Sequence, residues 1–131
     1  MPDSASCCEM PPTGNVLPIL HEIRHALHKL LETGEPTIID LRAMPFAPGE
    51  EKELEAQLGG GEVSVAIDAL GPSTVNETAI PGVWLVTHYN EQEEVVGKFI
   101  EITRMPSILE SQTEDIRSGL ERLSESLTNN S

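Results

Sequence analysis

The sequence has few basic residues. Lysine and arginine together number 8 in a chain of 131 residues, against 22 aspartate and glutamate residues, so the formal net charge is −14 at pH 7. A surface this acidic repels phosphate backbones and anionic membranes, which argues against binding to nucleic acid or to a lipid surface. It attracts a basic partner, or a partner with a complementary charged patch. The charge therefore favours a protein partner.

Long hydrophobic runs, a secretion signal and a disulfide framework are also lacking. No stretch of about 18 apolar residues occurs, so we expect no transmembrane helix. The N-terminal MPDSASCCEMPP has no positively charged start followed by an apolar stretch, so we expect no secretion signal. The two cysteines, Cys7 and Cys8, are adjacent, and a bridge between neighbours would be strained. These absences predict a cytoplasmic protein.

Aromatic residues make up only 3% of the chain, while apolar residues make up 38%. A core built from so few aromatic side chains depends on valine, isoleucine, leucine and alanine. The length fits one domain with a modest core. We expect a disordered segment over residues 1–14, a single α+β domain over 15–106, and an amphipathic helix with a frayed tail over 107–131.

Apolar spacing predicts the order helix, strand, helix, several strands, helix. The first helix is expected over residues 16–33, and its apolar stripe consists of Val16, Leu20, Ile23, Leu27 and Leu30 or Leu31. A second helix is expected over 50–58, and strands over 37–41, 62–70, 73–80, 83–89 and 94–103. The last two strands predict an antiparallel hairpin, and one option for the first strand is parallel pairing through the second helix. The predicted fold class is α+β, a mostly antiparallel sheet of about four to five strands with helices packed on one face.

The stretch HEIRH in the first helix fits the H-E-x-x-H pattern of zinc peptidases. His21 and His25 are one helical turn apart and Glu22 lies between them, as a zinc-bound water and its general base require. A third ligand is needed, and the candidates Glu50 and Glu51 are typical of a solvated helix start. A small zinc hydrolase built on these residues is therefore the alternative hypothesis, and a polar helix flank is the favoured interpretation.

Several phrases of the sequence occur together in a fixed order: LHEIRHAL, EPTIIDLRAMPFAPGE, LGGGEVSV, NETAIPGVWLVTH and FIEITRMPSIL. In this order and spacing they resemble the HupH/HyaF family of hydrogenase expression and formation proteins, in its conserved C-terminal region. The resemblance runs from about Leu17 to Leu109. Members of the family are commonly longer, with a domain that precedes this region.

The resemblance implies a non-enzymatic, chaperone-like accessory protein for the maturation of nickel–iron (NiFe) uptake hydrogenase. The family is linked to handling of the iron–sulfur small subunit before that subunit joins the large one, including protection during exposure to oxygen. The implied partner is the small-subunit precursor, with other maturation proteins as further candidates, and no cofactor is expected.

The phrase ETAIPGVW is the predicted contact site for this partner. Pro81 and Gly82 predict a rigid turn, and Trp84, the only tryptophan, is a large side chain of the kind that dominates binding interfaces. Glu77 and Thr78 precede the turn and complete the predicted partner-binding set. The competing interpretations are that Trp84 is a core residue of the hairpin and that Glu77 and Thr78 serve only the strand edge or the turn.

The C-terminal segment predicts an amphipathic helix that starts with the capping-box spacing of SILE, Ser107 to Glu110. Its apolar residues are Leu109, Ile116, Leu120, Leu123 and Leu127. Such a helix can pack on its own domain or meet a partner. A non-catalytic oligomerisation module, forming a homodimer through this helix, is therefore a third hypothesis.

Overall fold

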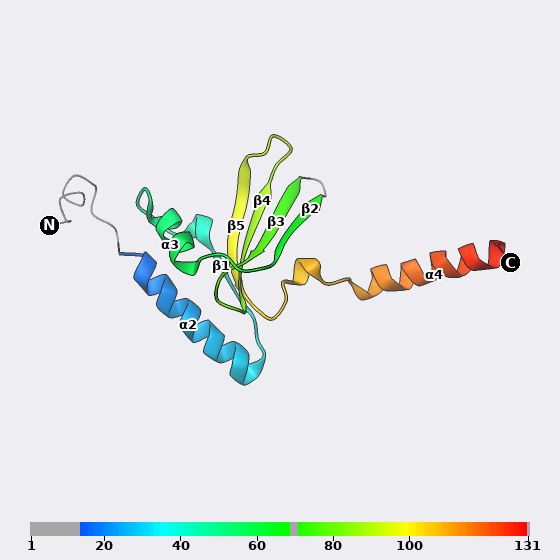
Figure 1. Cartoon of the computed structure of the whole chain (residues 1–131), viewed down its shortest axis with the longest axis horizontal. Helices are drawn as coiled ribbons and strands as arrows, with labels where there is room; N and C mark the ends of the chain where they lie inside the picture. Colours follow the sequence, from blue (N-terminus) through cyan, green and yellow to red (C-terminus); the bar gives the residue numbers. More distant parts are fainter. Residues whose placement is uncertain (1–13, 69–70, 131) are drawn as a thin grey trace.

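The computed structural model describes residues 14–68 and 71–130. The predicted disorder of residues 1–14 and the Cys7-Cys8 pair lie outside this part of the chain, Gly14 excepted. Figure 1 shows the arrangement of the elements. In chain order they are α2 (Val16–Thr33), β1 (Thr37–Asp40), the 3-10 turn η1 (Leu41–Ala43), α3 (Glu50–Leu58), β2 (Ser64–Asp68), β3 (Pro72–Glu77), β4 (Val83–Tyr89), β5 (Val95–Ile102), the 3-10 turn η2 (Ser107–Leu109) and α4 (Thr113–Asn129).

The five strands form one antiparallel sheet in the order β1-β5-β4-β3-β2, which confirms the predicted α+β class. Parallel pairing of the first strand is wrong, because β1 pairs antiparallel with β5 and places Ile39 opposite Ile100. The helix after β1 leads the chain to β2, which lies at the far edge of the sheet. The strand beside β1 is β5, which follows β4 in a hairpin and runs in the opposite direction to β1.

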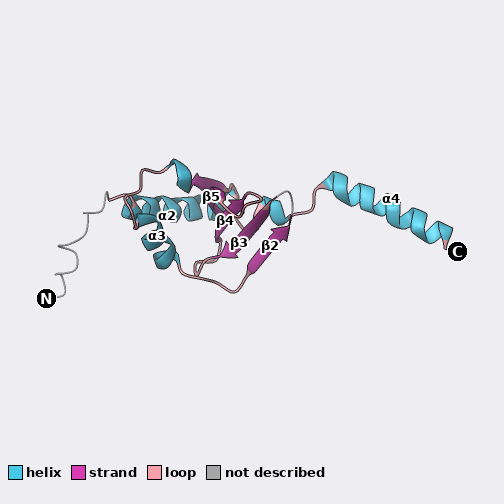
Figure 2. Ribbon diagram, turned by 90° about the horizontal axis from the view of Figure 1, so that it is seen from above, coloured by secondary structure: helices cyan, strands magenta, loops and turns pink. Residues whose placement is uncertain are grey.

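The sheet carries a core on each face, because alternate residues of a strand point to opposite sides. Val83 of β4 and Ile100 of β5 lie in the larger core with residues of α2 and α3. Trp84 and Val86 lie in a smaller core on the other face, where Leu109 of η2 packs against them. Figure 2 shows α2 and α3 on the same side of the sheet, as predicted.

Helix α2 ends where the sequence predicts, and its predicted stripe lies against the core, with Leu30 as its last member. Gly34 adopts a left-handed conformation (φ 80°), and its N–H donates to the Leu30 carbonyl at 2.9 Å. The buried residues are Val16, Ile19, Ile23, Ala26 and Leu30. Ala26 thus faces the core, and Leu27 lies at its edge. Leu31 remains 74% exposed and is available for other contacts.

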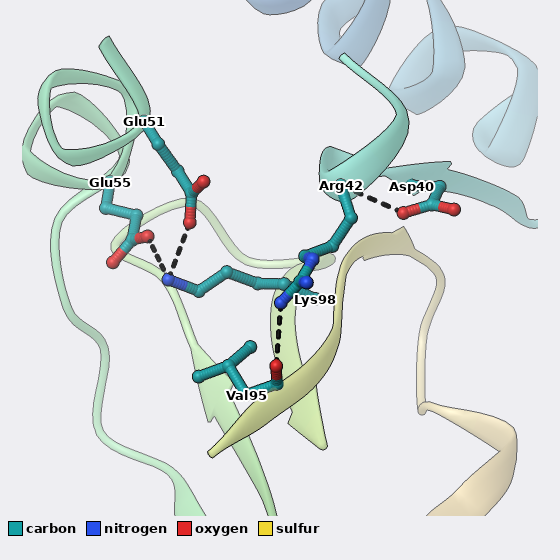
Figure 3. A network of polar contacts seen from close by, with 6 residues as sticks. All are labelled: Asp40, Arg42, Glu51, Glu55, Val95 and Lys98. Atoms are coloured by element: carbon teal, nitrogen blue, oxygen red, sulfur yellow. Dashed lines mark hydrogen bonds and ion pairs between the residues drawn. The ribbon is translucent and has the colours of Figure 1, made fainter. Parts of the chain in front are cut away.

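A pair of carboxylates on α3 binds one lysine of the sheet (Figure 3). Lys98 of β5 donates from Nζ to Glu51 Oε2 at 2.9 Å and to Glu55 Oε2 at 2.6 Å. Burial by itself would lower the pKa of Lys98, but the hydrogen bonds and charges of the two glutamates raise it above its ordinary value. The ammonium group therefore stays charged at neutral pH and holds α3 on the sheet.

The C-terminal helix begins later than the sequence predicts. Residues Ser107–Leu109 form the 3-10 turn η2, and Glu110 is extended (ψ 130°), so its carboxylate does not belong to a capping box. Leu109 packs against the smaller core, which accounts for the interruption. Helix α4 then starts at Thr113, contains no buried residue and projects away from the sheet in Figures 1 and 2.

Candidate functional site

A pocket of about 500 Å³ lies between the last turns of α2, the β3–β4 turn and the segment that follows β5. It is lined by Leu27, Leu30, Leu31, Glu77, Pro81, Gly82, Trp84 and Arg104. Four of the five residues of the predicted contact site therefore meet at one pocket, and Thr78 is the exception. The lining is mainly apolar with one acidic and one basic side chain, which is the composition of a site that binds an apolar group in a defined orientation.

The β3–β4 turn has the geometry that the Pro-Gly pair predicts. The Val83 N–H donates to the Ile80 carbonyl at 3.0 Å, and Gly82 has φ 94°, so residues 80–83 form a type II turn. A Cβ atom on Gly82 would lie 3.3 Å from Leu27 Cδ2. The turn therefore favours glycine here through its positive φ, and any larger residue would also crowd the Leu27 side chain of α2.

Thr78 supports this turn from inside. The residue is buried, and its hydroxyl donates to the Val83 carbonyl at 2.9 Å and accepts from the Ile80 N–H at 3.2 Å. The Thr78 hydroxyl is therefore hydrogen-bonded to the backbone of the turn, and the residue does not line the pocket. The competing interpretation of Thr78 as a turn-bonding residue fits this geometry.

Trp84 is both a core residue and part of the pocket wall. Its side chain is only 8% exposed and belongs to the smaller core with Val75 and Val86. Its indole Nε1–H donates to the Thr103 carbonyl at 3.1 Å, which is the partner that a buried indole requires. The ring therefore has a fixed position, and the part that reaches the pocket offers a rigid apolar surface.

Arg104 is an exposed cation at this pocket, although the chain is short of positive charge. An ion pair of Arg104 with Glu101 or Asp40 is what a chain with so few cations would favour, but within residues 14–68 and 71–130 no carboxylate lies within ion-pairing distance of its guanidinium group. Asp40 instead accepts from the Arg42 backbone N–H at 2.9 Å, and the Arg42 guanidinium donates to the Val95 carbonyl at 2.8 Å (Figure 3). Arg104 therefore lines the pocket without an ion-pair partner among the described residues.

Sequence reasoning did not assign Arg104 or the three leucines of α2 to this site. The leucines were placed in the apolar stripe of the helix, and only Leu30 is buried there. A signal was present in the adjacent pair Leu30-Leu31, since consecutive helical residues are about 100° apart and cannot both face the same core. Leu31 therefore had to point elsewhere.

The HEIRH motif lies on the exposed side of α2, one to three turns before the pocket. His21, Glu22 and His25 are all exposed, and His21 Nδ1 lies 3.2 Å from Arg24 Nη2. The proposed third ligands are engaged elsewhere, because Glu50 accepts from the Ala47 N–H and Glu51 binds Lys98. No group of three metal-ligating side chains occurs in the described part of the chain. The geometry thus lends no support to the zinc-hydrolase alternative.

Glu101 of β5 lies opposite Trp84 in the sheet, and burial raises the pKa of its carboxyl group above its ordinary value, with a smaller opposing effect from the charge of His88. A carboxyl group whose pKa is higher in the folded state stabilises the fold only when it is protonated, so stability rises as the pH falls through that pKa. We therefore expect Glu101→Gln to raise the melting temperature at neutral pH, with the gain shrinking as the pH falls toward 4.5.

Thermal denaturation followed by circular dichroism at several pH values measures this effect. Glu62→Gln is the matched control, because it removes the same charge from an exposed side chain. An equal gain in both variants would show that general charge reduction, and not the burial of Glu101, is responsible.

In the described part of the chain, none of the helices combines the length and the apolar character needed to cross a bilayer.

A known protein family matches nearly the whole chain. The family described as "HupH hydrogenase expression protein, C-terminal conserved region" matches residues 13–129. The chain belongs to the HupH family. The match extends from just before α2 to the end of α4 and includes every residue of the pocket. The resemblance inferred from the five sequence phrases is thereby confirmed.

Relatives of this HupH-family chain carry names from hydrogenase biosynthesis. It is 32% identical over 113 residues to the hydrogenase expression/formation protein HupQ of Azotobacter chroococcum mcd 1, covering 85% of this chain and 40% of that protein. It is 28% identical over 109 residues to the hydrogenase expression/formation protein HupH of Rhizobium leguminosarum bv. viciae, covering 83% and 39%. The chain thus spans about two fifths of the length of these relatives.

A solved structure has the same fold. The hydrogenase expression protein HupH from Thiobacillus denitrificans ATCC 25259 is 44% identical, with a TM-score of 0.85 over 91% of this chain and 99% of that one. At this level of identity the backbone that forms the pocket is expected to be shared by both proteins.

Proposed function

We propose that this chain is a non-enzymatic accessory protein of NiFe uptake-hydrogenase maturation. In this proposal it binds the precursor of the iron–sulfur small subunit through the pocket between α2 and the β3–β4 turn. Membership of the HupH family and the names of the relatives support the hydrogenase pathway. The observation that carries the proposal is the meeting of Glu77, Pro81, Gly82 and Trp84 with the exposed Leu31 at one pocket.

The chemistry of the pocket fits an unfinished subunit. A subunit that has not yet joined its partner exposes apolar side chains that the finished complex will bury. Covering Leu31, the exposed leucine of the pocket, would stabilise such a complex by up to about 1.5–3 kcal/mol. Glu77 and Arg104 provide one charge of each sign, which sets the direction of the bound segment. The net charge of −14 adds long-range attraction to basic surface on the precursor.

We place this step in the cytoplasm, where adjacent cysteines such as Cys7 and Cys8 stay reduced. Other maturation proteins are further proposed partners, since delivery of the small subunit to the large one requires release from this pocket.

Co-purification tests the proposal. A tagged chain is expressed in cells that make the hydrogenase, and the recovered small-subunit precursor is quantified by immunoblot. Leu31→Glu is expected to reduce the recovery at least about tenfold, because it removes an apolar contact and adds a second carboxylate beside Glu77, a loss of about 1.4 kcal/mol or more.

Leu17→Glu is the matched control, because Leu17 is a similarly exposed leucine on the same helix (62%) and does not line the pocket. This variant is expected to retain the precursor. The proposal fails if the unmodified chain recovers no small-subunit precursor, or if the two variants lose it equally. Normal hydrogenase activity in a strain that lacks the gene would also count against it.

A further inference from the structure

Helix α4 carries an uncovered apolar face. Ile116, Leu120, Leu123 and Leu127 are each between 58% and 63% exposed, and the helix has no buried residue. In Figure 1 it extends away from the domain after η2. A single helix of 17 residues is only marginally stable in water, so a helix of this kind depends on burying its apolar face.

The apolar residues follow the spacing of a coiled coil. The intervals between them are four, three and four residues, which places Leu120 and Leu127 at heptad position a and Ile116 and Leu123 at position d. In this frame the acidic residues fall at the outer positions b, c and f. They are Glu114, Asp115, Glu121 and Glu125. The seam is therefore continuous and apolar over three helical turns.

The positions beside the seam carry almost no charge. Positions e and g are Arg117, Gly119, Ser124 and Ser126. Arg117 is the only charge among them, and its guanidinium is neutralised by Glu114 Oε1 of the same helix at 2.6 Å. Two copies of a chain with a net charge of −14 repel each other unless the surfaces that meet are free of like charge. This helix meets that condition along its whole seam.

We propose that α4 is a dimerisation helix, and that the seams of two copies of this chain pack together as a two-stranded coiled coil. The small residues Gly119, Ser124 and Ser126 flank the seam and allow the two helices to approach closely. No residue of the pocket lies on α4, so dimerisation leaves the proposed precursor site open. This inference is independent of the proposed function, and either can fail alone.

Sedimentation velocity of the full-length protein over a range of concentrations tests the proposal. The unmodified chain is expected to show a monomer–dimer equilibrium, and Leu120→Glu is expected to weaken it at least about tenfold, since it places two carboxylates in the seam. Ser118→Glu is the matched control, because position f adds the same charge on the opposite side of the helix. This variant is expected to dimerise like the unmodified chain.

Salt provides a second measurement. Because the seam is apolar and the rest of the chain repels its copy, raising the salt concentration is expected to strengthen the dimer by screening that repulsion. An interface built from ion pairs would weaken instead. Leu127→Glu, near the end of the helix, repeats the test where loss of the domain fold is not expected. A chain that stays monomeric at every concentration and salt level, or equal dimerisation of Leu120→Glu and Ser118→Glu, overturns the proposal.

Discussion

The substitution Gly61→Ala is expected to destabilise the fold by about 1–3 kcal/mol, the cost of forcing a methyl group against a neighbouring backbone carbonyl. A Cβ atom on Gly61 would lie 2.5 Å from the Thr78 carbonyl oxygen and 2.9 Å from Glu77 Oε1. The backbone cannot move away easily, because the Gly61 N–H donates to the Glu77 carbonyl at 2.8 Å. Since Glu77 and Thr78 lead into the pocket turn, the same change is expected to weaken precursor binding.

Gly60→Ala is the control for this prediction. A Cβ atom on Gly60 meets nothing within 4 Å, so alanine is expected to be neutral there or to stabilise the protein by about 0.4–1 kcal/mol through the unfolded state. Guanidinium denaturation of both variants gives the two free energies of unfolding. If Gly61→Ala unfolds at the same denaturant concentration as Gly60→Ala, the close contact with Thr78 is wrong.

The second large effect is expected from Trp84→Ala. Removing a buried tryptophan costs about 3–5 kcal/mol, because the cavity left among Val75, Val86 and Leu109 is filled only in part. A loss of this size is a large fraction of the stability of a small domain. Denaturation is followed by far-ultraviolet circular dichroism, since this is the only tryptophan and its fluorescence disappears with the substitution.

Trp84→Phe separates the two contributions of this residue. Phenylalanine keeps most of the apolar contact but leaves the Thr103 carbonyl without the indole N–H, for which about 1–3 kcal/mol is expected. The phenylalanine variant should therefore lie between the unmodified chain and the alanine variant. Equal loss in both variants would mean that the hydrogen bond, and not packing, dominates.

Local chemistry explains why the centre of the site could be predicted from the sequence. Proline followed by glycine selects a type II turn through the backbone angles of these two residues alone. The strands β4 and β5 could be predicted as well, because two runs rich in β-branched and aromatic residues, VWLVTHY and EVVGKFIEIT, enclose the polar loop NEQEE. Neither inference requires knowledge of what packs against the segment.

Other parts of the site depend on tertiary contacts that no local pattern encodes. Arg104 comes to the pocket because β5 runs beside β4, and the pairing of β1 with β5 is decided by the route of the chain across the sheet. Helix α4 starts late because Leu109 packs against the smaller core.

The backbone of Thr103 is held from two sides. Its N–H donates to the Gly82 carbonyl at 2.9 Å, and its carbonyl accepts from the Trp84 indole. These two hydrogen bonds link three parts of the pocket wall: the β3–β4 turn, the Trp84 indole and the segment that contains Arg104. The binding surface is therefore preorganised. Nearly all of the conformational entropy lost on binding would be lost by the bound segment of the partner. In the role proposed here, the lifetime of the complex would then be governed by how far the captured subunit has folded.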